Sequence, residues 1–306
     1  MPLTPTPEPV WVVGPVTWDE VHVTDPVDVV DRIPGGTALY TARASDALGV
    51  QAHLLVLGGG DADLDALEGH DVHLVEAATL TLRHDFPGGK REQTLVQASG
   101  RTVVPGDVPA EWPEPRTLIL APLLAEDVDI VAFIDEYPTA EVGLLAQGLQ
   151  RAVLPDQRIA HRAQPASALL DAARPNVSIF LSEEETALWA AGALDYLVAR
   201  CARVVVTRGA DGARVLTRSG ERVITAAPAD PVDATGAGDV FGAAFILAMR
   251  AGEEFAGRVA AACAAAACEV RGPGVLPSLT ELEARFHVGL TDVGADVAPA
   301  DGGHPA

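Results

Sequence analysis

The sequence predicts an α/β fold: a doubly wound, mainly parallel sheet flanked by helices, with a small antiparallel β lid at one edge. Two observations support this fold class. Short apolar runs of strand length alternate with segments of helical pattern along most of the chain. Strands that are apolar throughout are typical of parallel sheets buried on both faces. Two other segments alternate polar and apolar residues, which indicates half-exposed antiparallel strands instead.

The expected core strands are short apolar runs, separated by lengths of chain that suit helices. Residues 20–33 and 79–96 form the expected lid, and Gly35 and Gly36 follow its first segment as a flexible joint. A helix is expected after this joint, from about Thr37 to Leu48. The core strands are predicted at Val10–Val13, Ala52–Leu57, Val72–Val75, Thr117–Ala121, Val142–Leu145, Val177–Leu181 and Val204–Thr207.

The chain is expected to form a single domain, from residue 10 to residue 291, that includes both lid segments. Residues 1–9 and 292–306 are rich in Pro, Gly, Ala and Asp and lack periodicity, so we expect disordered tails. No linker is long enough to separate two full domains. Length alone would allow two, but doubly wound folds often reach this size as one.

The composition favours chemistry on small molecules. The formal net charge is −22, which opposes binding to nucleic acid or to an anionic membrane, because both attract Lys and Arg. The cysteines, Cys201, Cys263 and Cys268, lack metal-type spacing and fit a reducing compartment. Neither a signal peptide nor a membrane span is evident, so a cytoplasmic protein is expected.

The most informative motif is DATGAGDVFGAAFILAMRAG, which starts at Asp233. Its second half is apolar nearly all round, which predicts a buried helix from about Gly238 to Arg250. The first N–H groups of a helix lack internal partners, and small residues at 236–238 leave room for an anion to approach them. Asp239 lies in the first turn, where a carboxylate is placed to accept a proton from a hydroxyl. The motif therefore predicts a phosphate cradle beside a general base.

Two other interpretations of this motif follow from the residues alone. For an isolated Gly-Asp helix start, the simpler interpretation is that Thr235 caps the helix and that Asp239 only interacts favourably with the helix dipole. Alternatively, Gly236, Gly238 and Gly242 form a dinucleotide fingerprint. No apolar strand precedes these glycines, which disfavours hydride chemistry.

The string GAGD, followed by Phe241, resembles the C-terminal signature of the ribokinase-like (pfkB) family of sugar and nucleoside kinases. IPGGTALYTARASDALG, from Ile33, is similar to the family's N-terminal signature, and Asp19 lies where relatives carry an Asp that binds substrate hydroxyls. The resemblance covers nearly the whole chain. It implies a catalytic base at Asp239, an anion hole at Gly236, Ala237 and Gly238, and acceptor contacts at Asp19, Gly35, Gly36 and Tyr40.

For the phosphate donor, the resemblance implies ATP and Mg²⁺, and it leaves a monovalent cation open. VVVTRGADGARVL resembles the family's strand, turn and strand that lie against the nucleotide. LSEEETALW resembles an Asn-x-x-Glu element that organises magnesium through water, with Ser in place of Asn. AAACAAAACEVRGPG resembles the helix and loop that flank the adenine pocket. Without the resemblance these are a tight turn, an acidic helix start and a small-residue packing helix. The implied cofactor contacts are Ser182, Glu185 (to the metal through water), Thr207, Gly209, Gly212 and Cys263.

The acceptor is expected to be a neutral sugar or polyol, with a nucleoside as the alternative. Tyr40 replaces an Asn that the family signature often carries, so specificity should differ from ribokinase itself. TLRHDFPGGKREQTLVQ and VGLLAQGLQR resemble a subgroup that includes plant-type myo-inositol kinases. Few basic residues fall on the matched substrate elements, which disfavours a phosphosugar. A catalytically inactive ligand-binding relative is the competing class, and exposed lid strands could pair in a homodimer.

Overall fold

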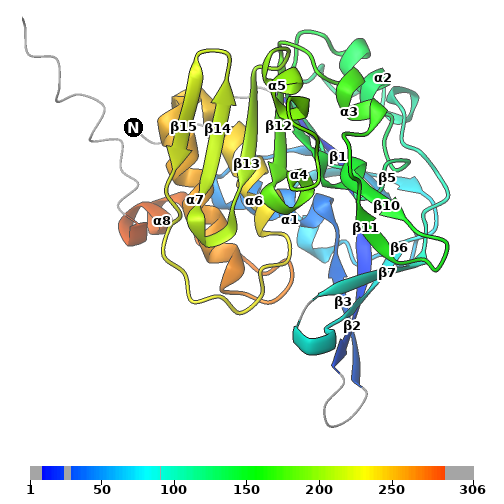
Figure 1. The fold of residues 1–306 in the computed structure, drawn as a ribbon. Coiled ribbons are helices and arrows are strands. Elements are labelled where there is room, and N and C mark those ends of the chain that lie inside the picture. Colours follow the sequence, from blue (N-terminus) through cyan, green and yellow to red (C-terminus); the bar gives the residue numbers. More distant parts are fainter. Residues whose placement is uncertain (1–8, 24–28, 90, 287–306) are drawn as a thin grey trace, which may run out of the picture.

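The computed structural model describes residues 9–23, 29–89 and 91–286, and its main feature is a nine-stranded sheet (Figure 1). The predicted tails lie outside the described residues, apart from residue 9. All of the predicted core strands are present, and they form the parallel part of the sheet; only β14 and β15 run antiparallel. In sheet order the strands are β15 (Gly220–Ile224), β14 (Ala213–Thr217), β13 (Arg203–Thr207), β12 (Val177–Ser182), β9 (Glu141–Leu145), β8 (Thr117–Leu120), β1 (Val10–Pro15), β4 (His53–Gly58) and β5 (Asp71–Glu76).

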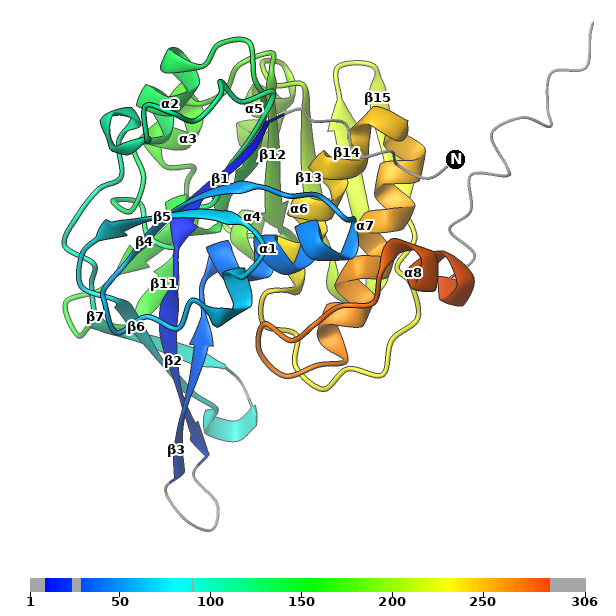
Figure 2. The same cartoon turned by 180° about the vertical axis from the view of Figure 1, so that it is seen from behind.

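Helices cover both faces of this sheet, as Figures 1 and 2 show. Because successive side chains of a strand point to opposite faces, Val12 of β1 joins one apolar core while Trp11 and Val13 join the other. One face carries α1 (Thr37–Ala47), α6 (Ala237–Ala248), α7 (Glu253–Cys268) and α8 (Leu279–Phe286); the other carries α2 (Ile130–Glu136), α3 (Ser167–Asp171) and α5 (Ala193–Val198). The predicted doubly wound α/β class is confirmed.

Shorter helices connect these elements. The four-residue helix α4 (Glu183–Thr186) follows β12 directly. Single turns of 3₁₀ helix lie at η1 (Asp65–Leu67), η2 (Pro87–Gly89), η3 (Pro105–Asp107), η4 (Ala146–Gln150), η5 (Gly209–Asp211) and η6 (Met249–Ala251).

A separate four-stranded sheet forms the lid, in the order β3 (Val29–Gly35), β2 (Thr17–Val23), β6 (Leu80–Asp85) and β7 (Glu92–Gln97). The predicted lid is thus confirmed as a small sheet, but its pairing is antiparallel only in part. β2 and β6 pair in parallel. The reason is that β2 continues from β1 and β6 follows β5, so both leave the same edge of the parallel sheet in one direction. An unpredicted ribbon of β10 (Arg151–Val153) and β11 (Ile159–His161) lies beside β7.

The glycine pair between the lid and α1 is required by close packing. Gly36 has φ of +99°, and a Cβ added there would lie 2.5 Å from the carbonyl oxygen of Pro15. A Cβ on Gly35 would lie 2.6 Å from Oδ2 of Asp19. Any larger residue at either position would therefore displace β2 and the Asp19 carboxylate. A hinge at this joint stays a prediction.

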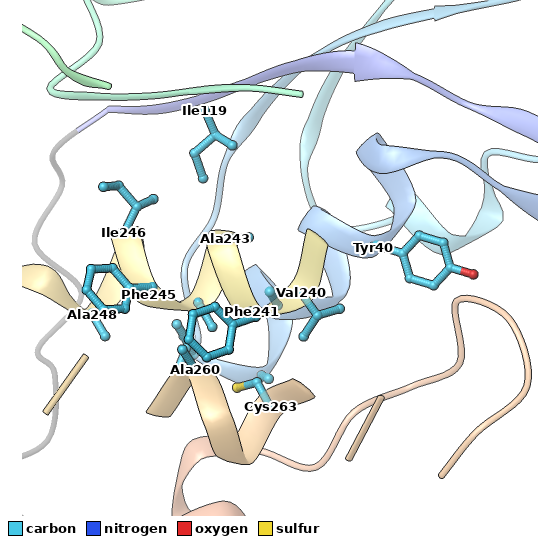
Figure 3. Packing of buried hydrophobic residues seen from close by; sticks show 14 of the residues in the cluster. Tyr40, Ile119, Val240, Phe241, Ala243, Phe245, Ile246, Ala248, Ala260 and Cys263 are labelled. Carbon is cyan, nitrogen blue, oxygen red and sulfur yellow. The ribbon is translucent and has the colours of Figure 1, made fainter. Parts of the chain in front are cut away.

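Helix α6 is anchored in the core along its length, as the sequence predicts. Figure 3 shows Val240, Phe241 and Phe245 in this cluster, with Cys263 of α7 packed against it. The rings of Phe241 and Phe245 stack with centroids 6.2 Å apart. The N-terminus of α6 is therefore held in place by a rigid apolar core.

Candidate active site

A pocket of about 150 Å³ lies between the lid and the N-terminus of α6, at the carboxyl ends of the parallel strands. It brings together six of the residues predicted from sequence: Asp19, Gly36, Tyr40, Gly236, Gly238 and Asp239. The remaining lining residues are Thr17, Thr37, Leu82, His84, Arg91, Gln93, Leu123, Gln147, Arg151, Ala234 and Thr235.

The N-terminus of α6 has no side-chain cap, so the interpretation of Thr235 as a capping residue is wrong. The N-cap is Gly236, in the left-handed conformation with φ of +76°. Instead of capping, Thr235 donates its backbone N–H to Oδ1 of Asp233 over 2.9 Å. A Cβ on Gly236 would lie 2.2 Å from the ring of Tyr40, so only glycine fits. The N–H of Ala237 donates to the carbonyl of Ala234 over 3.3 Å, whereas the amides of Gly238 and Asp239 have no backbone acceptor within the described residues and are available to an anion in the pocket.

Asp239 is a buried carboxylate on the pocket wall, with 6% of the residue exposed. Within the described chain no Lys, Arg or His lies within ion-pair distance of it. Burial raises its pKa to about 7; Arg151 and Arg91 lower it and Glu185 raises it further. A carboxylate with a pKa near neutrality, and with no side-chain hydrogen bond among the residues that the structure describes, is suited to act as a general base.

Asp19 is buried on the opposite wall, in a small hydrogen-bonded network. Thr17 donates its hydroxyl to Oδ1 of Asp19 over 3.1 Å, and Nε2 of His84 lies 3.4 Å from the same oxygen. Arg91 donates from Nε to Nδ1 of His84 over 2.9 Å. Because Nδ1 accepts this bond, the neutral imidazole carries its hydrogen on Nε2, facing Asp19. The network fixes the Asp19 carboxylate toward the space that an acceptor would fill.

Two arginines reach the pocket from elements that sequence reasoning did not connect. Arg151 begins β10 and is only 7% exposed. Arg91 lies at the mouth and is exposed as a residue, yet its guanidinium turns inward to His84. The sequence did contain a signal for them, because Arg91 lies in the predicted lid segment 79–96 and Arg151 ends the string AQGLQR. The premise that the acceptor region holds few basic residues is therefore wrong for the folded pocket.

Ser182 and Glu185 form a reciprocal capping box at the start of α4. Glu185 accepts from the backbone N–H of Ser182 over 2.7 Å, and Ser182 Oγ accepts from the N–H of Glu185 over 3.2 Å. Burial raises the pKa of Glu185, which is 5% exposed. The pair thus has a structural role at this helix start, and a role in organising magnesium stays a prediction.

The other predicted nucleotide contacts do not line this pocket. Thr207 donates its hydroxyl to the carbonyl of Leu181, and a Cβ on Gly212 would lie 2.0 Å from the carbonyl oxygen of Ile224. Gly209 starts the turn η5. The side chain of Cys263 is fully buried in the core and offers no exposed surface to a ligand.

A second, more apolar groove of about 270 Å³ lies between α7, α8 and the loop after β15. Ala261 of α7 lines it, and the carbonyl of Cys268, seven residues further on, accepts from the N–H groups of Val232 and Asp233. Seven helical residues span about 10 Å. One helix therefore connects the groove to the loop that leads into Gly236. The groove is lined by Thr225, Ala226, Ala227, Pro228, Arg258, Ala261, Arg285 and Phe286.

Two other features are absent from the described ranges. Residues 9–23, 29–89 and 91–286 contain no group of three or more His, Cys, Asp and Glu placed to hold a metal ion. None of the helices in these ranges combines the length and the apolar character that crossing a membrane requires.

Comparisons with known proteins agree on one family. The model for "pfkB family carbohydrate kinase" matches residues 127–282. Ribokinase of Bacillus subtilis (strain 168) is 36% identical over 85 residues, a match that spans 27% of this chain and 29% of that protein's length.

Solved structures of similar fold cover nearly the whole chain. One is a pyrophosphate-dependent kinase in the ribokinase family complexed with a pyrophosphate analog and myo-inositol (TM-score 0.70, 16% identity, 90% of this chain and 99% of that one). A second is Arabidopsis thaliana ribokinase complexed with ribose and ATP (0.66, 18%, 92% and 99%). A third is Burkholderia thailandensis nucleoside kinase in complex with inosine (0.69, 18%, 92% and 99%). At these identities the likeness concerns the fold alone.

Proposed function

The chain belongs to the pfkB family of carbohydrate kinases, and from this premise we propose that it transfers the γ-phosphate of ATP to a hydroxyl of a small sugar or polyol. The observation that carries the proposal is the buried carboxylate of Asp239, which has no ion pair within the described residues, beside the uncapped N-terminus of α6. The pocket of about 150 Å³ is smaller than the roughly 300–1,000 Å³ typical of sites for drug-sized ligands. This size favours a small acceptor over a nucleoside.

The proposed reaction uses these groups in one in-line step. Asp19 holds the acceptor, and Asp239 takes the hydroxyl proton as the acceptor oxygen bonds to the γ-phosphorus. The bond from the γ-phosphorus to the bridging oxygen breaks, and ADP leaves with that electron pair. Backbone amides at Gly236 to Gly238 stabilise charge on the transferred group, which is the largest contribution that the protein makes.

The site also fits a magnesium ion held mainly by its substrate. Magnesium in such sites is usually bound by one or two carboxylates, substrate phosphates and water, so a cluster of three protein ligands is not required. The charge of Glu185 raises the pKa of Asp239, so Glu185 would help to hold a cation in this region through water. When bound, magnesium would neutralise charge on the donor phosphates.

The pH dependence of kcat/KM is expected to report the ionisation of Asp239. The base acts only when deprotonated, and its pKa is about 7. The rate should therefore fall about tenfold per pH unit below that value and reach a plateau above it. Initial rates at fixed ionic strength between pH 5 and 9 measure the profile. A plateau that extends unchanged to pH 5 would contradict this assignment.

We propose that the base of ATP occupies the second groove, since α7 connects it to the α6 N-terminus. Filling the groove with Ala261→Phe should raise KM for ATP roughly tenfold, equivalent to about 1.4 kcal/mol, and leave kcat within a few-fold. Ala229→Phe, at an exposed position in the same loop but outside the groove lining, is the control.

Steady-state kinetics on both variants test this placement, with pyrophosphate as a second donor. Pyrophosphate has no base, so its KM should not respond to Ala261→Phe. An unchanged KM for ATP in a folded Ala261→Phe protein, or more efficient transfer from pyrophosphate than from ATP, would contradict a nucleotide in the groove.

Two further expectations remain proposals. Pairing of two copies through the lid would use β3, because the other edge strand of the described sheet, β7, is bridged by the segment that leads into β11. A binding protein of the same fold, without turnover, would be indicated if no sugar, polyol or nucleoside stimulated ATP consumption.

A further inference from the structure

Arg151 is an isolated buried cation on the wall of the pocket. Among the arginines that the structure describes it alone is buried, with 7% of the residue exposed, and it forms no ion pair in the described ranges. Its Nη1 donates to the carbonyl of Leu123, and its Nη2 donates to the side-chain oxygens of Gln93 and Gln147. These acceptors are all neutral. They orient the guanidinium without neutralising it.

Burying a cation without an ion pair is unfavourable, and here a second cation adds to the cost, while the charges of Asp239, Glu185 and Asp19 offset it only from beyond ion-pair distance. Arg91 also lines the pocket and forms no ion pair in the part of the chain that the structure describes. Burial, followed by the charge of Arg91, lowers the pKa of Arg151 to about 10, although nearby carboxylates act in the opposite direction. The two guanidinium groups therefore repel each other across the pocket, although the chain as a whole carries a net charge of −22. A ligand anion between them would offset both the cost of burying Arg151 and its repulsion from Arg91.

The position of the arginines assigns this anion to the acceptor. Arg91 contacts His84, which in turn faces Asp19, so it belongs to the wall that would hold the acceptor. Gln93, which fixes Arg151, comes from the lid strand β7 on the same wall. The terminal phosphate of the donor already has the uncapped N-terminus of α6 as its binding group.

We propose that Arg91 and Arg151 bind a carboxylate or phosphate group of the acceptor itself, so that the substrate is a sugar acid or a sugar phosphate. This inference rests on the proposed kinase function, and it replaces the neutral acceptor expected from sequence. The two arginines bind the anionic group of the acceptor. Asp19 orients the molecule so that one of its hydroxyls faces Asp239.

The first test measures binding without turnover, by thermal shift. The probes are matched sets of four to six carbons: a neutral aldose, the corresponding aldonic acid and the aldose monophosphate. At equal concentration, an acid or monophosphate should raise the unfolding temperature and its neutral counterpart should not. The shift should disappear in Arg91→Gln and Arg151→Met. It should persist in Arg158→Gln, which changes an exposed arginine that does not line the pocket.

The second test measures kcat/KM for the same acceptors with ATP and Mg²⁺. Wild type should prefer the best anionic acceptor over its neutral counterpart about 100-fold. Arg91→Gln should lower kcat/KM for that acceptor about 10- to 100-fold, as expected for a lost charge-assisted hydrogen bond, and should lower it distinctly less for the neutral one, which loses only the support that Arg91 gives His84. Arg91 is at the mouth of the pocket, so this variant should fold even if Arg151→Met does not.

The possible outcomes separate the inference from the kinase proposal. Preference for neutral acceptors, an equal effect of Arg91→Gln on both kinds, or no shift with any anionic probe overturns the inference while ATP use stands. A shift that depends on Arg91 but comes only from inorganic phosphate or pyrophosphate assigns the arginines to the donor and also overturns it. Binding of an anionic probe through Arg91, with no ATP consumed, supports the anion site and contradicts the kinase function.

Discussion

Replacing Asp239 by Asn is expected to lower kcat by roughly 10²- to 10⁴-fold, the usual contribution of a general base, while ATP still binds. The amide is nearly isosteric with the carboxylate but does not accept the hydroxyl proton. The amides of Gly236 to Gly238 and both pockets remain in place, so KM for ATP should change little. Steady-state kinetics with a confirmed acceptor measure both parameters, and a kcat near that of wild type would contradict the assignment.

The stability of the same variant provides an internal control. Folding raises the pKa of Asp239 from 3.8 to about 7, so the native state binds its proton more tightly than the unfolded chain does. The wild-type protein therefore loses stability as the pH rises from about 4 to about 7, on the order of 2–4 kcal/mol for this group. The Asp239→Asn protein has no such loss, because its amide does not ionise.

Thermal unfolding at pH 8 and pH 5 measures this difference. The Asp239→Asn protein should unfold at a higher temperature than wild type at pH 8, and the difference should be clearly smaller at pH 5. A variant that is inactive and also less stable at pH 8 would indicate a damaged fold, and its lost activity could not be attributed to a missing base.

Gly236→Ala is expected to lower kcat at least about 100-fold, because small displacements of positioned groups reduce rates on that scale. The new Cβ would meet the ring of Tyr40 at 2.2 Å and would occupy a backbone with φ of +76°. Either Tyr40 moves into the pocket or the first turn of α6 shifts, and both changes disturb the anion cradle. The strain should also lower stability by about 1–3 kcal/mol.

A double-mutant cycle with Tyr40→Ala separates these causes. Removing the ring should recover part of the stability lost in Gly236→Ala, whereas the backbone strain remains. Stability is measured by denaturant unfolding, and additive effects of the two substitutions would contradict a direct clash between them.

The strands and α6 were predictable because their signals are local. Apolar runs such as Val204–Thr207 are short, bounded by turns and buried on both faces, and the all-round apolar pattern after Gly238 describes a core helix. The lid segments were found by their alternation. The parallel pairing of β2 with β6 was missed, because it depends on how β1 and β5 lead into the lid. No local sequence pattern indicates this direction.

The site was predictable where one motif carries it and missed where distant segments meet. Asp239 and its glycines lie within a single signature, whereas Arg91 and Arg151 converge on the pocket from the lid and from β10. Their lack of ion pairs within the described ranges is a property of the folded surroundings. The cap at Gly236 instead of Thr235 depends likewise on the space left by Tyr40, a residue far away in the sequence.

The central claim is that Asp239 serves transfer of the γ-phosphate of ATP to an acceptor hydroxyl. Transfer of label from γ-³²P-ATP to a panel of sugars, sugar acids, sugar phosphates, polyols and nucleosides tests it most directly, with wild type and Asp239→Asn side by side. The expected result is a labelled phosphoester from wild type and, under the same conditions, a trace or none from the variant. Absence of any labelled product from wild type, or equal yields from both proteins, would contradict the claim.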